Sequence, residues 1–130
     1  MNYKLVALFG LSFLAKITGC DFCTIINTKS HPQIIAEHNS VMAIKKLRPV
    51  NHVNFLIIPK THYKNLTTMN AQEIVEFFKD ACELLEQLRN KRNATASGQY
   101  TIHINNGELS AQTMFHLHMH VMSPDTSWGF

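Results

Sequence analysis

The stretch His116-Leu-His118-Met-His120-Val-Met122 alternates an imidazole with an apolar side chain over three cycles. In an extended strand every second side chain lies on the same face, so the three rings would project together while the apolar side chains enter the core. Three aligned imidazoles rarely serve stability, because each ring needs a hydrogen-bond partner and protonated neighbours repel one another. We therefore favour a functional row over a solvated strand face. Either all three rings bind a metal ion, or one ring is a catalytic nucleophile.

Composition indicates one compact domain. The chain has 130 residues, of which 45% are apolar and 16% are charged, so it is long enough for one domain with its own core and is not a disordered chain. The net charge is only +3, and the basic residues are scattered apart from a small cluster of Lys45, Lys46 and Arg48. A dedicated nucleic-acid binder normally carries a clearer basic stripe, so we expect no nucleic-acid partner.

Residues 1–19 differ from the rest of the chain. Leu5–Leu14 is an apolar run too short to span a bilayer, and the segment ends at Cys20 in a sequence similar to bacterial lipoprotein cleavage sites. However, Lys16 interrupts the region before that site, and acylation of Cys20 would destroy the cysteine pair described below. We therefore expect an apolar extension over 1–19 and one domain over 20–130, in a cytoplasmic protein without membrane association. The alternative is an exported or lipid-anchored protein.

The remaining pattern predicts an α+β domain. The turn sequence His38-Asn39-Ser40 separates two short apolar stretches, as in a hairpin, and Asn105-Asn106-Gly107 is a strong turn signal. A continuous apolar run that stops at Pro59 suits a central buried strand. The expected strands are Ile34–Glu37, Val41–Ile44, Phe55–Ile58, Tyr100–Ile104 and Thr113–Met122.

One long helix is predicted after Asn70, which is a good N-cap, with Glu73 placed to complete a capping box. Its apolar side chains follow a three- and four-residue spacing, so one face is buried against the sheet or a partner subunit. We place Cys82 on that buried side as a small core residue. The apolar positions are Ile74, Phe77, Phe78, Ala81, Leu84, Leu85 and Leu88.

Cys20 and Cys23 have the spacing at which two thiolates in a tight turn can bind one zinc ion. A structural site needs two more ligands, and His62 and His116 would complete a Cys2His2 set. The alternative is two ordinary thiols in a reducing cytosol. If His116 binds a metal, two rings of the row remain free, and a neutral imidazole such as His118 is a competent nucleophile toward phosphorus.

The loop before the histidine row is suited to hold a phosphate. Gln112 and Thr113 offer an amide and a hydroxyl, and the preceding Ser110 and Ala111 are small enough to expose backbone N–H groups. Donors of this kind bind a phosphate without much net charge.

These residues together resemble the histidine triad (HIT) superfamily, and in particular its Hint branch of purine nucleoside phosphoramidases. The histidine row is the defining motif of that family. The resemblance extends from Cys20 to Trp128 and includes three further segments in the family's order and spacing. They are Cys20-Asp-Phe-Cys-Thr-Ile-Ile26, Ile57-Ile-Pro-Lys-Thr-His62, and Asn105-Asn-Gly107 leading to Ala111-Gln-Thr-Met-Phe115.

The resemblance implies a fold and a reaction. The fold is a sheet of about five antiparallel strands with one long helix and a short N-terminal helix, dimerised into a continuous sheet. His118 would accept the nucleotidyl group as a phosphohistidine intermediate, which water hydrolyses to release a nucleoside monophosphate. His120 would contact the phosphate, and Thr113 would keep a hydroxyl near the leaving group.

The resemblance also implies binding residues for a purine nucleotide. Asn105 and Gln112 match phosphate-contacting positions, while Phe22 and Ile25 match the apolar walls of the base pocket. The zinc in family members with the cysteine pair is structural, with the ligands proposed above. Two alternatives remain, namely a nucleotide-binding regulatory dimer with vestigial activity and a dinucleoside polyphosphate hydrolase.

Three positions depart from the family pattern. Lys46 stands where an Asp commonly binds the ribose hydroxyls, which should weaken that contact and favour an extra phosphate or an acidic substrate group. Asn54 replaces a His often found at the start of its strand. Ala111 replaces a Gly beside the phosphate loop, where the added methyl would crowd the backbone.

Four histidines have no motif partner: His31, His38, His52 and His103. His103 would lie either on the sheet face beside the triad or on the surface as a hydrogen-bonded residue. His52 either substitutes for the missing His at position 54 or is an exposed loop residue.

Overall fold

A computed structural model describes residues 19–46, 53–92 and 98–125. The expected extension therefore lies outside the described residues, apart from Gly19. Of the described helices, none combines the length and the apolar character needed to cross a membrane. In chain order the elements are α2 (Asp21–Asn27), β1 (Ile34–His38), β2 (Val41–Lys45), β3 (Val53–Pro59), the 3-10 helix η2 (Leu66–Thr68), α3 (Ala71–Arg92), β4 (Thr101–His103), the 3-10 helix η3 (Glu108–Ser110) and β5 (Met119–Ser123).

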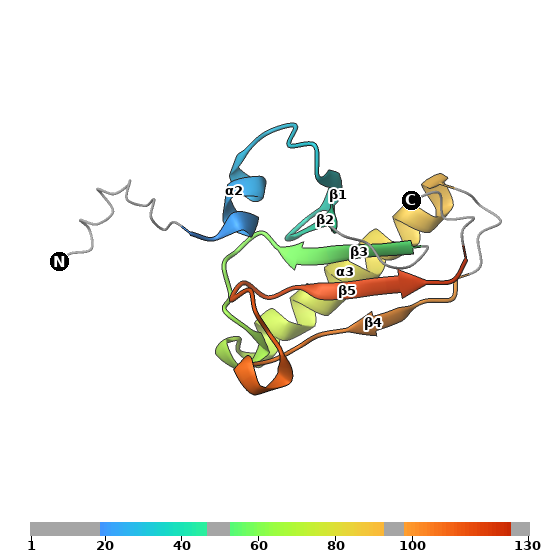
Figure 1. Ribbon diagram of the computed structural model, residues 1–130. Coiled ribbons are helices and arrows are strands. Elements are labelled where there is room, and N and C mark those ends of the chain that lie inside the picture. Colours follow the sequence, from blue (N-terminus) through green and yellow to red (C-terminus); the bar gives the residue numbers. More distant parts are fainter. Residues whose placement is uncertain (1–18, 47–52, 93–97, 126–130) are drawn as a thin grey trace.

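Five strands form one antiparallel sheet in the order β1-β2-β3-β5-β4, with α3 running behind it (Figure 1). The predicted α+β fold, with its long helix and short N-terminal helix, is confirmed. The expected hairpin forms between β1 and β2, where Asn39 adopts a positive φ of 49° in the turn. The apolar strand β3 lies at the centre of the sheet, as its continuous apolar run predicted.

Each face of the sheet carries its own apolar cluster, because side chains alternate between faces along a strand. Leu117, Met119 and Val121 are fully buried with α3 on one face. On the other face Phe22 and Ile25 of α2 pack over a second cluster. Its strand members are Met42 and Ile44 of β2 with Leu56 and Ile58 of β3. The alternation in the histidine row therefore separates core from site, as the sequence predicted.

The long helix begins as expected, with a reciprocal capping box. The Glu73 N–H donates to Asn70 Oδ1 over 2.8 Å, and the Asn70 N–H donates to Glu73 Oε1 over 2.9 Å. The prediction that Cys82 is a core residue is wrong, because its side chain is exposed. Cys82 follows the fully buried Ala81 by one residue, a rotation of about 100° around the helix axis, which takes it off the apolar stripe. Ile74 and Phe78 are only partly buried.

The predicted strand over Thr113–Met122 is wrong in its first half. β5 begins only at Met119, and residues 113–118 form an irregular segment beyond the sheet. The ladder with β3 ends near Pro59, which has no N–H to donate. The Leu117 N–H instead donates to the Tyr63 carbonyl over 2.7 Å. The alternation of faces nevertheless continues through this segment, because Leu117 is buried in the core beside α3.

A buried carboxylate joins the β1–β2 turn to α3. Asp80 accepts hydrogen bonds from Ser40 Oγ over 2.5 Å, from the Ser40 N–H over 3.2 Å and from Asn39 Nδ2 over 3.3 Å. Beside it, His38 Nε2 and Glu83 Oε1 lie 2.9 Å apart. These contacts fix the hairpin on the helix side of the sheet, opposite the candidate site.

Candidate functional site

His118 is held in one tautomer by the chain that carries it. Its ring is 9% exposed, and its Nδ1 lies 2.8 Å from the His116 carbonyl oxygen. A carbonyl only accepts, so Nδ1 carries the proton and donates it. In the neutral ring, the other nitrogen, Nε2, then carries the lone pair, which is the state that a nucleophile needs.

The predicted row continues across the sheet to a histidine that the sequence left unassigned. His120 lies 5.2 Å from the His118 ring and 5.3 Å from the His103 ring, centroid to centroid. His103 pairs with His120 in the β4–β5 register, so it lies on the face beside the triad. Burial, then the neighbouring His118, Lys46 and His103, lower the pKa of His120 to about 4. His120 is thus a neutral hydrogen-bonding group at neutral pH.

His116 turns away from the row toward the cysteine pair. It is fully buried, and its Nε2 donates to the Pro59 carbonyl over 2.9 Å. Burial lowers the pKa of His116 to about 4, so the ring is neutral. Its Nδ1 consequently presents a lone pair to the neighbouring thiols, the arrangement typical of a metal-ligating histidine with its second nitrogen anchored on a carbonyl. The hypothesis that all three rings share one metal is not favoured, because His118 and His116 face different groups.

The four predicted metal ligands are together. The donor atoms of Cys20, Cys23, His62 and His116 all lie within 4.8 Å of one another. Tetrahedral zinc would place two nitrogens about 3.3 Å apart and a nitrogen and a sulfur about 3.6 Å apart. The two Nδ1 atoms are 3.1 Å apart, and three of the four sulfur–nitrogen distances, those from Cys20 to His116 and from Cys23 to His62 and His116, are 3.2 to 3.6 Å. The donor set thus fits a zinc ion in number, chemistry and spacing.

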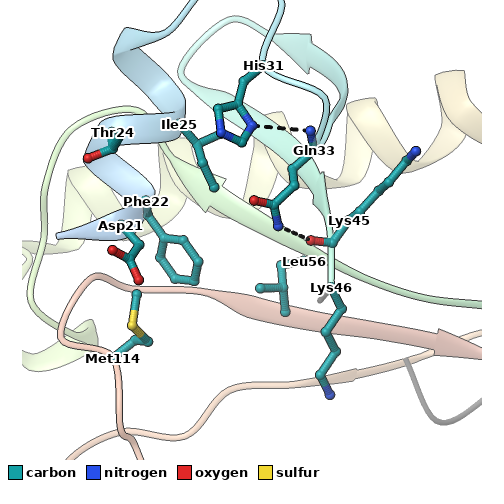
Figure 2. A pocket seen from close by; sticks show the side chains of 10 residues that line it. All are labelled: Asp21, Phe22, Thr24, Ile25, His31, Gln33, Lys45, Lys46, Leu56 and Met114. Carbon is teal, nitrogen blue, oxygen red and sulfur yellow. Dashed lines mark hydrogen bonds between the residues drawn. The ribbon is translucent and has the colours of Figure 1, made fainter. Parts of the chain in front are cut away.

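A cavity of about 360 Å³ opens beside the histidine row. Figure 2 shows Phe22 and Leu56 on its apolar side, with Lys46 extending from the end of β2 over β5. Phe22 meets the His118 ring edge-on at 5.4 Å, which places the cavity next to the proposed nucleophile. Ile25 lines the cavity as well, and the base-pocket role of Phe22 and Ile25 stays a prediction. Sequence reasoning gave no role to His31, Gln33 and Met114, which also line the cavity. Of these three, only Met114 belongs to one of the segments that carry the family resemblance.

A second cavity, of about 510 Å³, adjoins the first. Thr113 lines it together with Phe115, and Met114 lines both cavities. The ligands Cys20, Cys23 and His62 form its other side. Thr113 therefore lies at an open space beside the metal cluster, and its role near a leaving group stays a prediction.

The predicted phosphate loop is organised around a buried amide. Gln112 is 3% exposed; its Nε2 donates to the Lys64 and Met114 carbonyls, and its Oε1 accepts from the Gly107 N–H. Both amide protons are therefore used within the protein, and the phosphate contact of Gln112 stays a prediction. Asn105 uses one N–H on the Ser110 carbonyl over 2.7 Å, which leaves its second proton for a ligand.

The three departures from the family pattern have distinct surroundings. Ala111 adopts the left-handed conformation, with φ 67° and ψ 26°, where a glycine would be unstrained. Lys46 lines the first cavity. Asn54 is 7% exposed, and neither atom of its side-chain amide has a hydrogen-bond partner among the described residues.

Comparison with known proteins agrees with this fold. A family model described as HIT domain matches residues 27–127. The chain therefore belongs to the HIT domain family, whose name refers to the histidine triad.

Particular relatives are moderately similar. An adenylylsulfatase of Arabidopsis thaliana is 30% identical over 104 residues, which cover 79% of this chain and 51% of that protein. The solved structure of a HIT family hydrolase from Clostridium thermocellum shares 35% identity with a TM-score of 0.65, over 81% of this chain and 90% of the other. A zinc-bound histidine triad family protein from Mycobacterium smegmatis shares 26% identity with a TM-score of 0.64, over 84% and 86% of the two chains.

Proposed function

We propose that the protein hydrolyses a phosphoramidate or related nucleotidyl bond and releases a nucleoside monophosphate. The observation that carries the proposal is the hydrogen bond from His118 Nδ1 to the His116 carbonyl, which leaves Nε2 as a free nucleophile beside the cavity. The names of two relatives, a hydrolase and an adenylylsulfatase, support hydrolysis at a nucleotidyl group.

In the first step His118 Nε2 attacks phosphorus, and the bond from phosphorus to the leaving group breaks. The leaving group departs with the bonding electron pair into the Thr113 cavity and takes up a proton. Water then attacks the same phosphorus, the bond to Nε2 breaks, and the ring regains its lone pair. The attacking water releases one proton to the solvent, which balances the proton that the leaving group took up from the solvent in the first step. Neutral His120 donates a hydrogen bond to a phosphate oxygen in both steps, and the remaining N–H of Asn105 is a further donor.

We propose a structural role for zinc at Cys20, Cys23, His62 and His116. The zinc-bound relative and the fit of the donor set support it. When bound, the ion would supply a crosslink between α2 and the segments that follow β3 and precede β5. Cys20 and Cys23 lie at the start of α2, which also carries Phe22, and Phe22 packs against His118. A metal bound by the two cysteines would therefore help to hold Phe22 in place beside His118.

The decisive variant is His118→Ala, tested on adenosine and guanosine phosphoramidates and on dinucleoside polyphosphates. We expect turnover to fall by several orders of magnitude while the fold and the zinc content are unchanged. Normal turnover in this variant would overturn the proposal. If the wild-type protein binds nucleotides but forms no nucleotidyl adduct on trapping, a nucleotide-binding regulatory dimer is the better description.

We also propose a homodimer formed through one of the two edges of the sheet. β4 lies at this edge, and Ile102 on it is 42% exposed. A continuous sheet across two subunits would pair the free backbone groups of β4.

Cytoplasmic localisation remains a proposal as well, supported by the thiol ligands, which suit a reducing compartment. Intact-mass analysis of the natively expressed chain tests it against cleavage or acylation at Cys20.

A further inference from the structure

Lys46 and Asn54 lie side by side on the face of the sheet that carries the site. The β2–β3 register pairs Ile44 with Leu56 and Lys45 with Phe55. Continuing this register by one residue places Lys46 opposite Asn54. Residues opposite each other in an antiparallel pair point to the same face, with Cβ atoms about 5 Å apart. Asn54 is also two residues from Leu56, which lines the first cavity, so both side chains belong to that face.

The amide of Asn54 lacks the hydrogen bonds that a buried amide requires. Its side chain is more than nine-tenths buried, and both Nδ2 and Oδ1 are without a partner among residues 19–46, 53–92 and 98–125. Leaving such groups unpaired costs roughly 1–3 kcal/mol each. Every other buried side-chain nitrogen or oxygen of the described residues has a partner. Asn54 does not itself line the first cavity, but Lys46 and Leu56, its neighbours on the same face, do. An unpaired amide between two residues that line a ligand cavity indicates a missing partner.

The charges around this amide favour an anion. Lys46 has no ion-pair partner among the described salt bridges, and its positive charge reaches as far as His120, whose pKa it helps to lower. Among the described side chains that line the first cavity, Asp21 is the only carboxylate. Figure 2 shows it beside Phe22, across the cavity from Lys46. A negatively charged group next to Asn54 could thus accept hydrogen bonds from the Lys46 ammonium and the Asn54 amide N–H, while the Asp21 carboxylate lies on the other side of the cavity.

The distance between Asn54 and His120, which contacts the phosphate in the proposed reaction, indicates where on a nucleotide the second anionic group would lie. Asn54 pairs with Met122, and His120 is two residues before Met122 on β5. Asn54 and His120 are therefore diagonal neighbours, with backbones about 7–8 Å apart. A ribose ring spans such a distance between a phosphate at its 5′ carbon and a substituent on its 2′ or 3′ oxygen.

The geometry points to a second anion subsite, formed by Lys46 and Asn54, that takes a phosphate monoester on the sugar of the nucleotide. The inference rests on the proposed function, since it specifies the substrate class of the same site: nucleotides that carry an additional phosphate at the 2′ or 3′ position. The Lys46 ammonium and the Asn54 Nδ2 donate to the phosphate oxygens, and Asn54 Oδ1 accepts from the neighbouring sugar hydroxyl.

Binding of reaction-product analogues tests this subsite without turnover. We would compare adenosine 5′-monophosphate with adenosine 2′,5′- and 3′,5′-bisphosphate by titration calorimetry. The wild-type protein should bind one of the two bisphosphates about tenfold more tightly, as expected for one additional charge-assisted contact. Which bisphosphate is preferred assigns the 2′ or the 3′ position. If neither bisphosphate binds more tightly than the monophosphate, the subsite is overturned.

Two variants and a matched control assign the preference to these residues. Lys46→Met and Asn54→Leu should each reduce the bisphosphate preference to less than threefold. Asn54→Leu removes two unpaired buried polar atoms, so its melting temperature should not fall, and lost binding cannot be attributed to unfolding. Lys45→Met removes the same charge from the adjacent residue, whose side chain extends away from Lys46 in Figure 2, and should retain the preference. Retention of the preference in both test variants would refute the subsite.

Turnover separates this inference from the proposed function. Adenosine 5′-phosphoramidate and its 3′-phosphorylated and 2′-phosphorylated derivatives would be compared as substrates. If none is hydrolysed but the bisphosphate preference persists in binding, the proposed reaction fails and the subsite stands. If the unmodified phosphoramidate is hydrolysed and the extra phosphate gives no advantage in either binding or kcat/KM, the reaction stands and the subsite fails.

Discussion

Asp80 allows a quantitative test of how the β1–β2 hairpin is held on α3. The carboxylate is 2% exposed and accepts two hydrogen bonds from Ser40 and a third from the exposed Asn39. A hydrogen bond to a charged group contributes about 1.5–3 kcal/mol when buried, and the bond from the exposed amide contributes little. We therefore expect Asp80→Ala to lower the free energy of unfolding by about 3 kcal/mol at pH 7, measured by urea titration with circular dichroism.

The effect of Asp80 should depend on pH. Burial opposes ionisation and is the largest single influence, but the hydrogen bonds from Ser40 and Asn39 and the nearby Lys79 outweigh it and lower the pKa from its ordinary value of 3.8. A carboxylate with a depressed pKa contributes stability above its unfolded pKa and loses that contribution as the pH falls through the folded value. The difference between wild type and Asp80→Ala should thus be constant between pH 5 and 7 and shrink below about pH 4.

Two results would refute this reasoning. One is a destabilisation below 1 kcal/mol at pH 7, which would show that solvent replaces these hydrogen bonds. The other is a difference that persists unchanged at the lowest pH where the wild type remains folded. Glu86→Gln is a suitable control, because Glu86 is an exposed acid of the same helix that pairs with Arg89. It should change the free energy of unfolding little at any pH, since exposed ion pairs contribute little.

Three further outcomes are expected. Ala111→Gly should raise the free energy of unfolding, measured by urea titration, by about 0.5–1 kcal/mol. The reason is that relief of the strain of the left-handed conformation outweighs the greater entropy of the unfolded chain. A lower free energy of unfolding in this variant would show that the Ala111 methyl packs favourably. Cys20→Ser should abolish binding of about one zinc per chain, as measured by metal analysis, and lower the melting temperature. Zinc retained in this variant would contradict the ligand set. Ile102→Lys should shift the light-scattering mass toward that of a monomer, because charge on an edge strand opposes pairing; an unchanged dimer would exclude β4 as the interface.

Much of the fold was predictable because its signals are local. The capping box at Asn70 and Glu73, the apolar run of β3 and the period of two in the histidine row each depend on neighbouring residues. The same locality explains two errors. Cys82 lies one position from the apolar stripe of α3, and the extended pattern before Met119 has no ladder partner because β3 ends at Pro59. Neither fact follows from spacing alone.

The sequence by itself determined that three imidazoles project away from the core and that two thiols stand at the spacing of a metal site. Only the tertiary structure decided how those groups differ. The Pro59 carbonyl orients His116 toward the cysteines, while the His116 carbonyl fixes the proton of His118. The tertiary structure also decided that the Asn54 amide, beside Lys46, has no hydrogen-bond partner within the part of the chain that the structure describes. A side chain's chemical type is encoded locally, but its protonation and its missing partners depend on groups that only folding brings near.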